Sequence, residues 1–478
     1  MLKTTAAVQP RVNRSPTLPR TNIRIQPSPF SKYQPTIPAN TILNNPQGAK
    51  MTTTTTSDHS QKELNFAVEK PTDFEGPTTG PGPRGLINSQ IPEHQQSPSG
   101  TELEDVETEE MLINMGPQHP ATHGVLRVVL RTDGEMVLEA VPHLGYLHRC
   151  AEKIGENLPY YQYLPYTDRM DYVAGMTENW AFCHAVEKLA DIEIPRRAEF
   201  IRLIVAELQR IASHLVSFGT YALDLGAFTP FLYAFREREY ILDLFEMVCG
   251  ARLTYSFYTI GGLIHDLPDG WLDKVTEFVD YFDTKVPEYH GLLTYNRIFI
   301  KRTANVGVLS KDLAIKYATT GPMIRGSGIP YDLRRDKGYS VYPELDFNVC
   351  TGSGEMGTIG DCWDRYMVRM REMVESVKII RQCIKMIPDV ETGGAHRAKL
   401  KRNFKPPVGE VFVEMDNPRG TLGFFLESQG DITPYRVKAR SGAFCNLSVL
   451  GEICENVLLA DVPAIIGSID VVMGQVDR

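Results

Sequence analysis

The chain has 478 residues, of which 42% are hydrophobic, 23% charged and 9% aromatic. This composition excludes a disordered protein, a coiled coil, a collagen and a small disulfide-stapled scaffold, and the length predicts two or three folded units. The net charge of -9 disfavours a general nucleic-acid-binding protein, which needs excess Lys and Arg along the phosphates. No run of about 18 uncharged apolar residues occurs, so no membrane-spanning helix is predicted.

The N-terminal part differs in composition from the rest. Residues 1–57 contain no acidic residue but seven Lys or Arg, among many Pro, Ser, Thr and Asn. A basic, acid-poor start is typical of an organellar transit peptide, but seven prolines between positions 10 and 38 interrupt the amphipathic helix of such a peptide. We therefore interpret residues 1–57 as a disordered basic leader, with Met51 as an alternative start, and residues 58–110 as a polar linker.

The folded part is predicted to begin with strands. Residues 125–130 and 137–141 are rich in Val and Leu and flank Asp133-Gly134, which predicts a β-hairpin within an N-terminal region, 111–145. The next region, 146–405, has mostly helical periodicity. Within it we expect one helix over 199–218, one capped by Thr229 and ending near Cys249, and one over 363–386, whose inward residues are Met367, Met370, Val374, Val377 and Ile384.

A second hairpin is predicted near the C-terminus. Residues 411–415 and 422–426 flank a turn over 417–420, within a C-terminal region, 406–478. Few charges interrupt the apolar segment 465–478, so the chain end is expected to be tucked into the fold. Strands on both sides of a helical middle predict the α+β class, with a central helical bundle and flanking antiparallel β-hairpins.

The eight cysteines have no CxxC spacing. A zinc ribbon or a self-contained iron–sulfur site is therefore not expected, and the scatter of the cysteines through apolar stretches predicts reduced, mostly buried thiols.

A glycine-rich segment, 352–357, fits the pattern G-x-G-x-x-G before a predicted helix. A dinucleotide site needs a second strand after that helix, in a βαβ unit. Residues 391–405 follow instead and are polar and basic. We therefore favour a turn over a nucleotide site.

Two histidines lie four residues apart, His119 and His123, but Pro120 and the flanking glycines place them in a loop. Loops often carry functional residues, and an imidazole that titrates near neutral pH suits a proton-coupled reaction. Zinc is disfavoured because no Cys or carboxylate ligand is near in the sequence. Two histidines hydrogen-bonded within a turn are the simpler alternative.

A third segment, 166–172, contains two carboxylates, an arginine and two phenols. It is either a solvated helix start with Asp168 near the N-cap, or a partly buried charge cluster beside Tyr172. Asp224 is a lone acid in an apolar stretch, and a buried carboxylate needs a partner.

Eight segments in chain order carry a family resemblance. They are 116–127, 143–153, 166–173, 222–230, 294–297, 325–334, 360–366 and 461–478. Together they resemble the D-subunit family of respiratory complex I, the quinone-site large subunits of the proton-pumping NADH:quinone oxidoreductase. The resemblance covers about 111–478.

The family is similar in fold to the large subunit of nickel–iron hydrogenases, whose metal is held by two CxxC pairs. These pairs would fall in 169–174 and 470–475, where this chain has no Cys. Because thiolates are needed to hold nickel and iron, the resemblance implies that no metal is bound here and that the site accepts a quinone headgroup instead.

The resemblance also implies roles for single residues. Tyr172 and His123 are expected to hydrogen-bond the two quinone carbonyls, and Asp224 to pair with His123. Arg149 is expected near the iron–sulfur cluster of a partner. The residues expected to line or brace the quinone cavity are His119, Asp171, Asp470, Val472 and Arg478.

The implied partners are the other complex I subunits, especially a small subunit with the terminal [4Fe–4S] cluster and the membrane arm. No cofactor is expected in this chain alone; quinone is the substrate. The insertion 354–359 resembles bacterial forms, so we expect a peripheral protein on the cytoplasmic face of a bacterial inner membrane. The acid-free leader favours the alternative, the matrix side of the mitochondrial inner membrane.

Two other functions compete with the quinone site. A catalytic hydrogenase subunit is disfavoured by the missing paired cysteines. A non-redox scaffold that only seats the cluster-bearing subunit stays open.

Overall fold

The structure, a computed structural model, describes residues 110–388, 395–401 and 403–478. The leader predicted at 1–57 lies outside these residues, as does the linker predicted at 58–110 except for Glu110, which is the first residue of a strand. No helix of the described part has the length and apolar character needed to cross a membrane.

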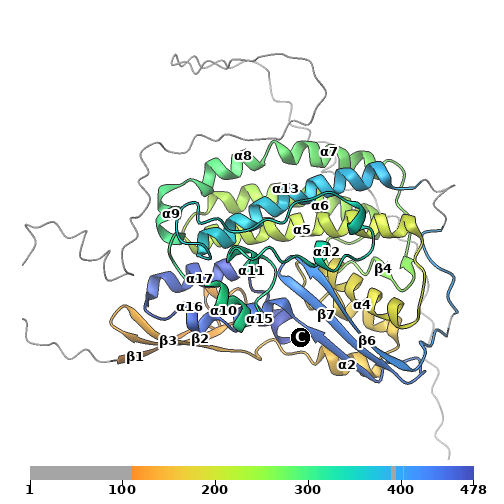
Figure 1. Cartoon of the computed structure of the whole chain (residues 1–478), viewed down its shortest axis with the longest axis horizontal. Helices are drawn as coiled ribbons and strands as arrows, with labels where there is room; N and C mark the ends of the chain where they lie inside the picture. Colours follow the sequence, from red (N-terminus) through yellow and green to blue (C-terminus); the bar gives the residue numbers. More distant parts are fainter. Residues whose placement is uncertain (1–109, 389–394, 402) are drawn as a thin grey trace, which may run out of the picture. The chain divides into compact units, whose positions relative to one another are not determined.

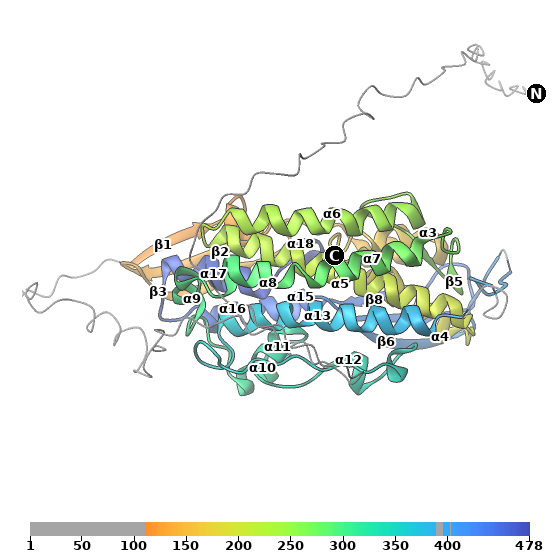
Figure 2. The ribbon, with the colours of Figure 1, turned by 90° about the horizontal axis from the view of Figure 1, so that it is seen from above.

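Long helices form one side of the described part, with the strands below most of them in the view of Figure 1. These helices are α4 (Gly175–Leu189), α5 (Arg196–Asp224), α6 (Thr229–Cys249), α7 (Trp271–Asp283) and α13 (Cys362–Met386). Helix α5 packs against both α6 and α13, and the two views show α5 and α13 running side by side (Figures 1 and 2). Its predicted apolar face is fully buried, as at Phe200, Leu203 and Ile204. Burial of this face stabilises the bundle, at about 25 cal/mol per Å² of apolar surface.

The predicted helix starts and inward residues are confirmed in part. Helix α13 begins where expected, because Oδ1 of Asp361 accepts a hydrogen bond from the backbone N–H of Asp364 at 2.8 Å. The prediction for Thr229 was wrong: Thr229 is the first residue of α6, and no side chain caps that end. Val374 was also predicted wrongly as inward, since 39% of it is exposed.

Two antiparallel sheets flank the helices. One has the order β1–β2–β3–β9, formed by Glu110–Met115, Arg127–Asp133, Met136–His143 and Val457–Leu458. The other has the order β6–β7–β8, formed by Gly409–Asn417, Gly420–Ser428 and Arg436–Arg440. Both predicted hairpins are confirmed, by the pairings of β2 with β3 and of β6 with β7. Helix α4 packs across β6 and β7.

Short elements connect these layers. The short helices are α2 (Ala151–Asn157), α3 (Tyr160–Thr167), α8 (Val286–Tyr289), α9 (Arg297–Thr303), α10 (Lys311–Lys316), α11 (Pro322–Gly326), α12 (Leu333–Asp336), α15 (Gly442–Leu447), α16 (Leu450–Ile453), α17 (Val462–Ile469) and α18 (Met473–Asp477). Strands β4 (Tyr258–Thr259) and β5 (Gly262–Leu263) pair with each other. Single turns are η2 (Pro120–Thr122), η3 (His290–Thr294), η4 (Tyr342–Glu344) and η5 (Leu459–Asp461).

The α+β class is confirmed, whereas likeness to hydrogenase large subunits stays a prediction. The predicted burial of the chain end is also confirmed, because every residue of α18 is buried. Helix α17 packs against α5, α13 and η2, so the C-terminal segment joins the helical bundle to the histidine loop.

Candidate functional site

The histidine loop, residues 116–124, connects β1 to β2. The Nδ1 atom of His119 accepts a hydrogen bond from the backbone N–H of Ala121 at 3.1 Å, and this caps η2. His123 follows η2 in the left-handed backbone conformation (φ 48°), which is uncommon for a residue other than glycine. The alternative of a histidine hydrogen-bonded within the turn is therefore confirmed for His119. It does not hold for His123, whose side chain contacts Asp224.

His123 contacts a residue distant in the sequence. Its Nε2 lies 2.9 Å from Oδ2 of Asp224, the last residue of α5. Both side chains are nearly buried, with 11% and 8% exposed. Gly467 of α17 packs against the same carboxylate: a Cβ there would lie 2.7 Å from Oδ2 of Asp224. The predicted pairing of Asp224 with His123 is thus present, and α17 encloses it.

A hollow of about 350 Å³ lies beside this pair. It is lined by His119, Pro120, Ala121, His123, Thr220, Leu223, Asp224 and Pro463. A second hollow, of about 420 Å³ and mostly apolar, shares His119 and Pro463 with the first. Three of the predicted site residues, His119, His123 and Asp224, therefore line one cavity.

The two carboxylates of the segment 166–172 are buried, whereas Tyr166 and Arg169 are exposed. Asp168 and Asp171 have 0% exposure, so of the two alternatives the solvated helix start is wrong and the partly buried charge cluster is present. Asp168 follows the end of α3 instead of capping a helix start. Its buried carboxylate accepts hydrogen bonds from the backbone N–H and Oγ of Ser256, both at 2.8 Å. Burial raises the pKa of Asp168 to about 6.

Asp171 and Asp470 share one arginine. The Nη1 atom of Arg419 lies 2.9 Å from Oδ2 of Asp171, and its Nη2 lies 3.5 Å from Oδ1 of Asp470. Burial raises the pKa of Asp171 despite Arg419. Burial alone would also raise the pKa of Asp470, but Arg419 and Arg369 hold it below its ordinary value. The segments 169–174 and 470–475, where the resemblance predicts the positions of the hydrogenase cysteine pairs, thus meet at Arg419.

Tyr172 lies beside this ion pair and is half-buried. Burial, followed by the nearby Asp171, raises the pKa of the phenol, so Tyr172 is neutral at pH 7. Helix α18 approaches it closely at Gly474. A Cβ there would lie 2.7 Å from the carbonyl oxygen of Met170 and 3.1 Å from both the Tyr172 ring and Nη2 of Arg149.

The chain end is bound to residues 145–151. The carboxylate of Asp477 accepts hydrogen bonds from the N–H groups of Gly145 (2.9 Å) and Leu147 (2.7 Å). The carbonyl oxygen of Arg478 accepts from the N–H of Arg149 at 3.1 Å. This attachment fixes α18 against Tyr172.

The remaining predicted residues lie near this segment. Arg149 donates to the carbonyl oxygen of Arg169. Val472 is buried between α17 and α18. The guanidinium of Arg478 donates to the carbonyl oxygen of Ala439 at 2.8 Å and does not line the hollow of His123. Arg478 therefore braces the chain end instead of lining that cavity.

Sequence reasoning missed three residues of the site: Arg419, Glu178 and Gln475. Arg419 stood in a predicted hairpin turn, where an arginine is normally exposed. Glu178 and Gln475 hydrogen-bond each other at 2.8 Å, from α4 and α18. A carboxylate in an otherwise apolar helix face was the one signal available for Glu178.

The glycine-rich segment is a turn that binds a carboxylate of its own chain. Backbone N–H groups of Ser353, Gly354 and Gly360 donate to Asp364 of α13, at 3.0–3.3 Å. All pairings among the described strands are antiparallel, so the described residues contain no βαβ unit. The turn interpretation is confirmed.

The described residues hold no group of three or more His, Cys, Asp or Glu side chains arranged to bind a metal. Their cysteines form no disulfide. Cys183, Cys362, Cys383 and Cys454 are buried, and Cys150 is exposed.

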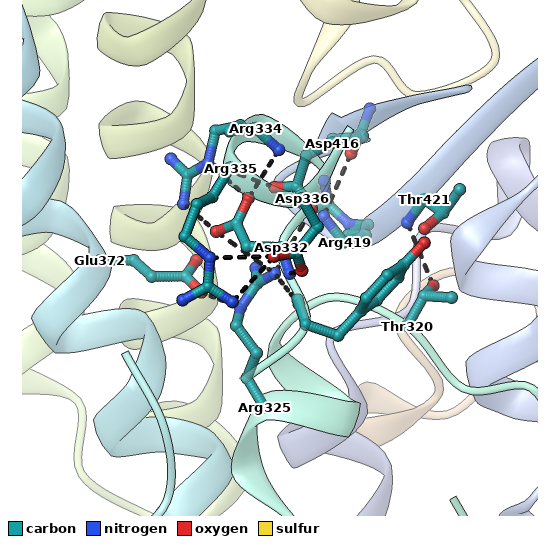
Figure 3. Close-up of polar contacts among 12 residues, drawn as sticks. Thr320, Arg325, Asp332, Arg334, Arg335, Asp336, Glu372, Asp416, Arg419 and Thr421 are labelled. Atoms are coloured by element: carbon teal, nitrogen blue, oxygen red, sulfur yellow. Dashed lines mark hydrogen bonds and ion pairs between the residues drawn. The ribbon is translucent and has the colours of Figure 1, made fainter. Parts of the chain in front are cut away.

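A large cluster of buried arginines and carboxylates lies near the site. Figure 3 shows its arginines and carboxylates pointing toward one another from α11, α12, α13 and β6. We call it the ionic cluster, and its members are Glu207, Arg210, Arg325, Asp332, Arg334, Glu372 and Asp416. All are buried. Glu372 also pairs with His214 at 2.9 Å, and burial lowers the pKa of that histidine.

Comparison with known proteins identifies the family. Residues 224–478 match the family described as the 49 kDa subunit of respiratory-chain NADH dehydrogenase. The D subunit of the NADH-quinone oxidoreductase of Chlorobium luteolum is 56% identical over 375 residues, which are 78% of this chain and 95% of the relative. That of Chlorobaculum tepidum is 55% identical, over 78% of this chain and 94% of the relative.

The chain belongs to this family, the D subunits of NADH-quinone oxidoreductase. It is thus one part of a multi-subunit oxidoreductase, respiratory complex I. The match covers nearly the whole length of both relatives.

Proposed function

We propose that this subunit supplies the headgroup site at which complex I reduces quinone. One observation carries the proposal: His123, in a left-handed backbone conformation, contacts Asp224 at 2.9 Å on the wall of a hollow. The pair joins residues 101 positions apart, so the fold is built to place this imidazole. Tyr172 lies beside α18. Helix α18 directly follows α17, the helix that encloses the His123–Asp224 pair.

The chemistry of quinone reduction suits these side chains. The reaction takes two electrons and two protons, and protons come from acids within hydrogen-bond reach. In this proposal the electrons arrive from the terminal [4Fe–4S] cluster of an adjacent small subunit, with Arg149 on that side. Tyr172 and His123 bind the two carbonyl oxygens and give the protons. Asp224 orients His123.

Other residues are assigned to holding the site. Asp171, Asp470 and Arg419 fix the turn that carries Tyr172. His119 lines the cavity, and Val472 and Arg478 keep the C-terminal segment in place. Proton donation leaves a charge change on the His123–Asp224 pair, which in this proposal starts the signal to the membrane arm and its proton pump.

The proposal includes a place in the cell. The two relatives compared above are from bacteria, and their identity with this chain favours the cytoplasmic face of a bacterial inner membrane over the matrix side of the mitochondrial one. The protein would lie there as a peripheral protein, between the small subunit and the membrane arm.

The test uses His123→Ala and Tyr172→Phe in the assembled complex. Each is expected to lower kcat for quinone reduction about 100-fold, the usual contribution of a positioned acid. Oxidation of NADH by ferricyanide, which does not need the quinone site, should be retained. His265→Ala is the control, because His265 is exposed. A scaffold that only seats the partner would keep normal quinone reduction in both variants.

A further inference from the structure

Glu178 is a buried acid close to Tyr172. It is the fourth residue of α4 and is fully buried. Its Oε1 accepts a hydrogen bond from Nε2 of Gln475 at 2.8 Å, whereas its Oε2 has no partner among the described residues. Gln475 follows Gly474, which packs on the Tyr172 ring. Glu178 therefore lies under the part of α18 that contacts Tyr172.

Burial and the lack of a basic partner favour the protonated form of Glu178. Asp171 and Asp470 are balanced by two guanidinium groups, those of Arg419 and Arg369. No ion pair of Glu178 with an arginine or lysine occurs among the described residues. Burial, and then the charge of Asp171, raises the pKa of Glu178 well above its ordinary value. Burial thus favours the neutral form of Glu178.

Asp168 connects Glu178 with the surface. Its Oδ2 is bound by Ser256, which is half-buried in the loop before β4. Its Oδ1 is buried without a partner among the described residues and packs against Gly175, where a Cβ would lie 3.3 Å away. Gly175 and Glu178 are three residues apart, on one face of α4. Asp168 therefore packs against α4 about one turn before Glu178, and the two carboxylates are electrostatic neighbours.

We propose that Asp168, Glu178 and Asp171 form a relay that carries protons from the surface near Ser256 to Tyr172. The proposal rests on the proposed function, since it supplies the proton that Tyr172 gives to the quinone. We call Asp168, Glu178 and Asp171 the relay acids.

Each step of the relay moves one proton. The phenol O–H of Tyr172 breaks and the quinone oxygen gains that proton, while the partner's iron–sulfur cluster supplies the electrons. Asp171 is ionised beside Arg419, so it first takes a proton from Glu178 and then gives that proton to the phenolate. Glu178 takes a proton from Asp168, and Asp168 takes one from water near Ser256. After two electrons and two protons the quinone is a quinol, and all three acids have their starting protonation states.

The decisive variant is Glu178→Gln in the assembled, membrane-bound complex. Glutamine keeps an oxygen for Gln475 but has no acidic proton. We expect kcat for reduction of a soluble short-chain quinone to fall about tenfold, with KM unchanged. The solvent isotope effect, the ratio of kcat in H₂O to kcat in D₂O, should rise because proton delivery becomes rate-limiting. Glu178→Asp should restore part of kcat.

Glu199→Gln is the matched control. Glu199 holds the same position in the first turn of α5, and burial also raises its pKa. Its charged neighbours are Arg202, Arg196, Glu187 and Glu344, all outside the site. This variant should keep the wild-type kcat and isotope effect. Glu199 is half-buried. An equal loss in Glu199→Gln would overturn the proposal, because loss of kcat would then follow removal of an acid outside the site as well.

A second variant, Asp168→Asn, tests the relay independently in case Glu178→Gln does not assemble. Asp168→Asn can retain both hydrogen bonds from Ser256 through its amide oxygen. It should lower kcat several-fold with the same rise in isotope effect, and wild-type values of both would overturn the relay. Loss of kcat in Tyr172→Phe beside full activity in both relay variants rejects the relay alone. Full activity in Tyr172→Phe rejects the quinone site itself.

Discussion

Two groups of buried charges lie close together in this protein, and their pairing differs. In the ionic cluster, Arg334 contacts Asp332 at 2.7 Å and Glu207 at 3.3 Å, and Arg325 contacts Glu372 at 2.8 Å. Hydroxyl groups of Ser376 and Tyr342 donate further hydrogen bonds to Glu207. Nearly every oxygen and nitrogen there has a partner, and the contacts join α5, α11, α12, α13 and β6.

The charges at the candidate site are paired less completely. The Nε atoms of Arg419 and Arg369, Oδ2 of Asp470 and Oε2 of Glu178 are buried without a hydrogen-bond partner among the described residues. Arg369 Nε and Asp470 Oδ2 are 3.8 Å apart, longer than a direct hydrogen bond. An unpaired buried polar atom costs free energy. The ionic cluster, whose atoms are nearly all hydrogen-bonded, therefore serves stability. The candidate site has more buried atoms without a hydrogen-bond partner, and these are free for chemistry.

Removal of an arginine from the ionic cluster should have the largest effect. Arg325→Met leaves Glu372, Asp416 and Asp332 facing one another with fewer cations, all of them buried. We expect a loss of about 3–5 kcal/mol in the free energy of unfolding, as for other broken buried ion pairs. The measurement is the melting temperature of the purified complex, together with its yield.

The control for this prediction is a substitution of a nearby but exposed arginine, Arg335. Arg335 pairs with Asp336, with 47% and 30% of the side chains exposed. Arg335→Met should cost less than about 1 kcal/mol. Similar melting temperatures for the two variants would show that pairing in the ionic cluster does not stabilise the fold.

The second prediction concerns the close approach of α18 to Tyr172. A Cβ at position 474 would lie 2.7 Å from the backbone oxygen of Met170, so Gly474→Ala must shift α18 or the turn that carries Tyr172. We expect kcat for quinone reduction to fall about tenfold, since small misplacements of reacting groups are costly. Gly291→Ala is the control, because no atom lies within 4 Å of its added Cβ. Unchanged kcat in Gly474→Ala would remove this contact from the mechanism.

Periodicity and turn chemistry predicted the elements well, because burial of one face decides them. Apolar residues at helical spacing predicted α5, and the turn signal at Asp133-Gly134 predicted the β2–β3 hairpin. The same local signals failed at Thr229, where a good capping residue lies inside the helix. They failed at Val374 too, since tertiary packing and not residue type decides which side of a helix is covered.

The site was predictable only where residue types are unusual for their surroundings. Asp224 in an apolar stretch required a partner, and His123 is that partner. Arg419 could not be found this way: its two carboxylates, Asp171 and Asp470, are separated from it by 248 and 51 positions. Such a contact depends on the packing of β7, α4 and α17, which no local pattern contains.

The smallest expected effect is a pH-dependent change in stability at Asp168, which has one buried oxygen without a hydrogen-bond partner among the described residues. Burial raises the pKa of Asp168 from its ordinary 3.8 to about 6. The folded state therefore binds this proton more tightly than the unfolded state, and its contribution to stability, complete below pH 4, is lost as pH rises to 6 and above. Asp168→Asn has no such loss. Relative to wild type, it should gain about 1 kcal/mol between pH 5 and pH 7.

The measurement is the difference in melting temperature between Asp168→Asn and wild-type complex at several pH values from 5 to 8. Because Ser256 is retained as a hydrogen-bond donor, the pH-independent part of that difference should be small. A difference that does not change with pH would mean that Asp168 is ionised throughout this range. In that case Asp168 would resemble the carboxylates of the ionic cluster and could not serve as the entry of a proton relay.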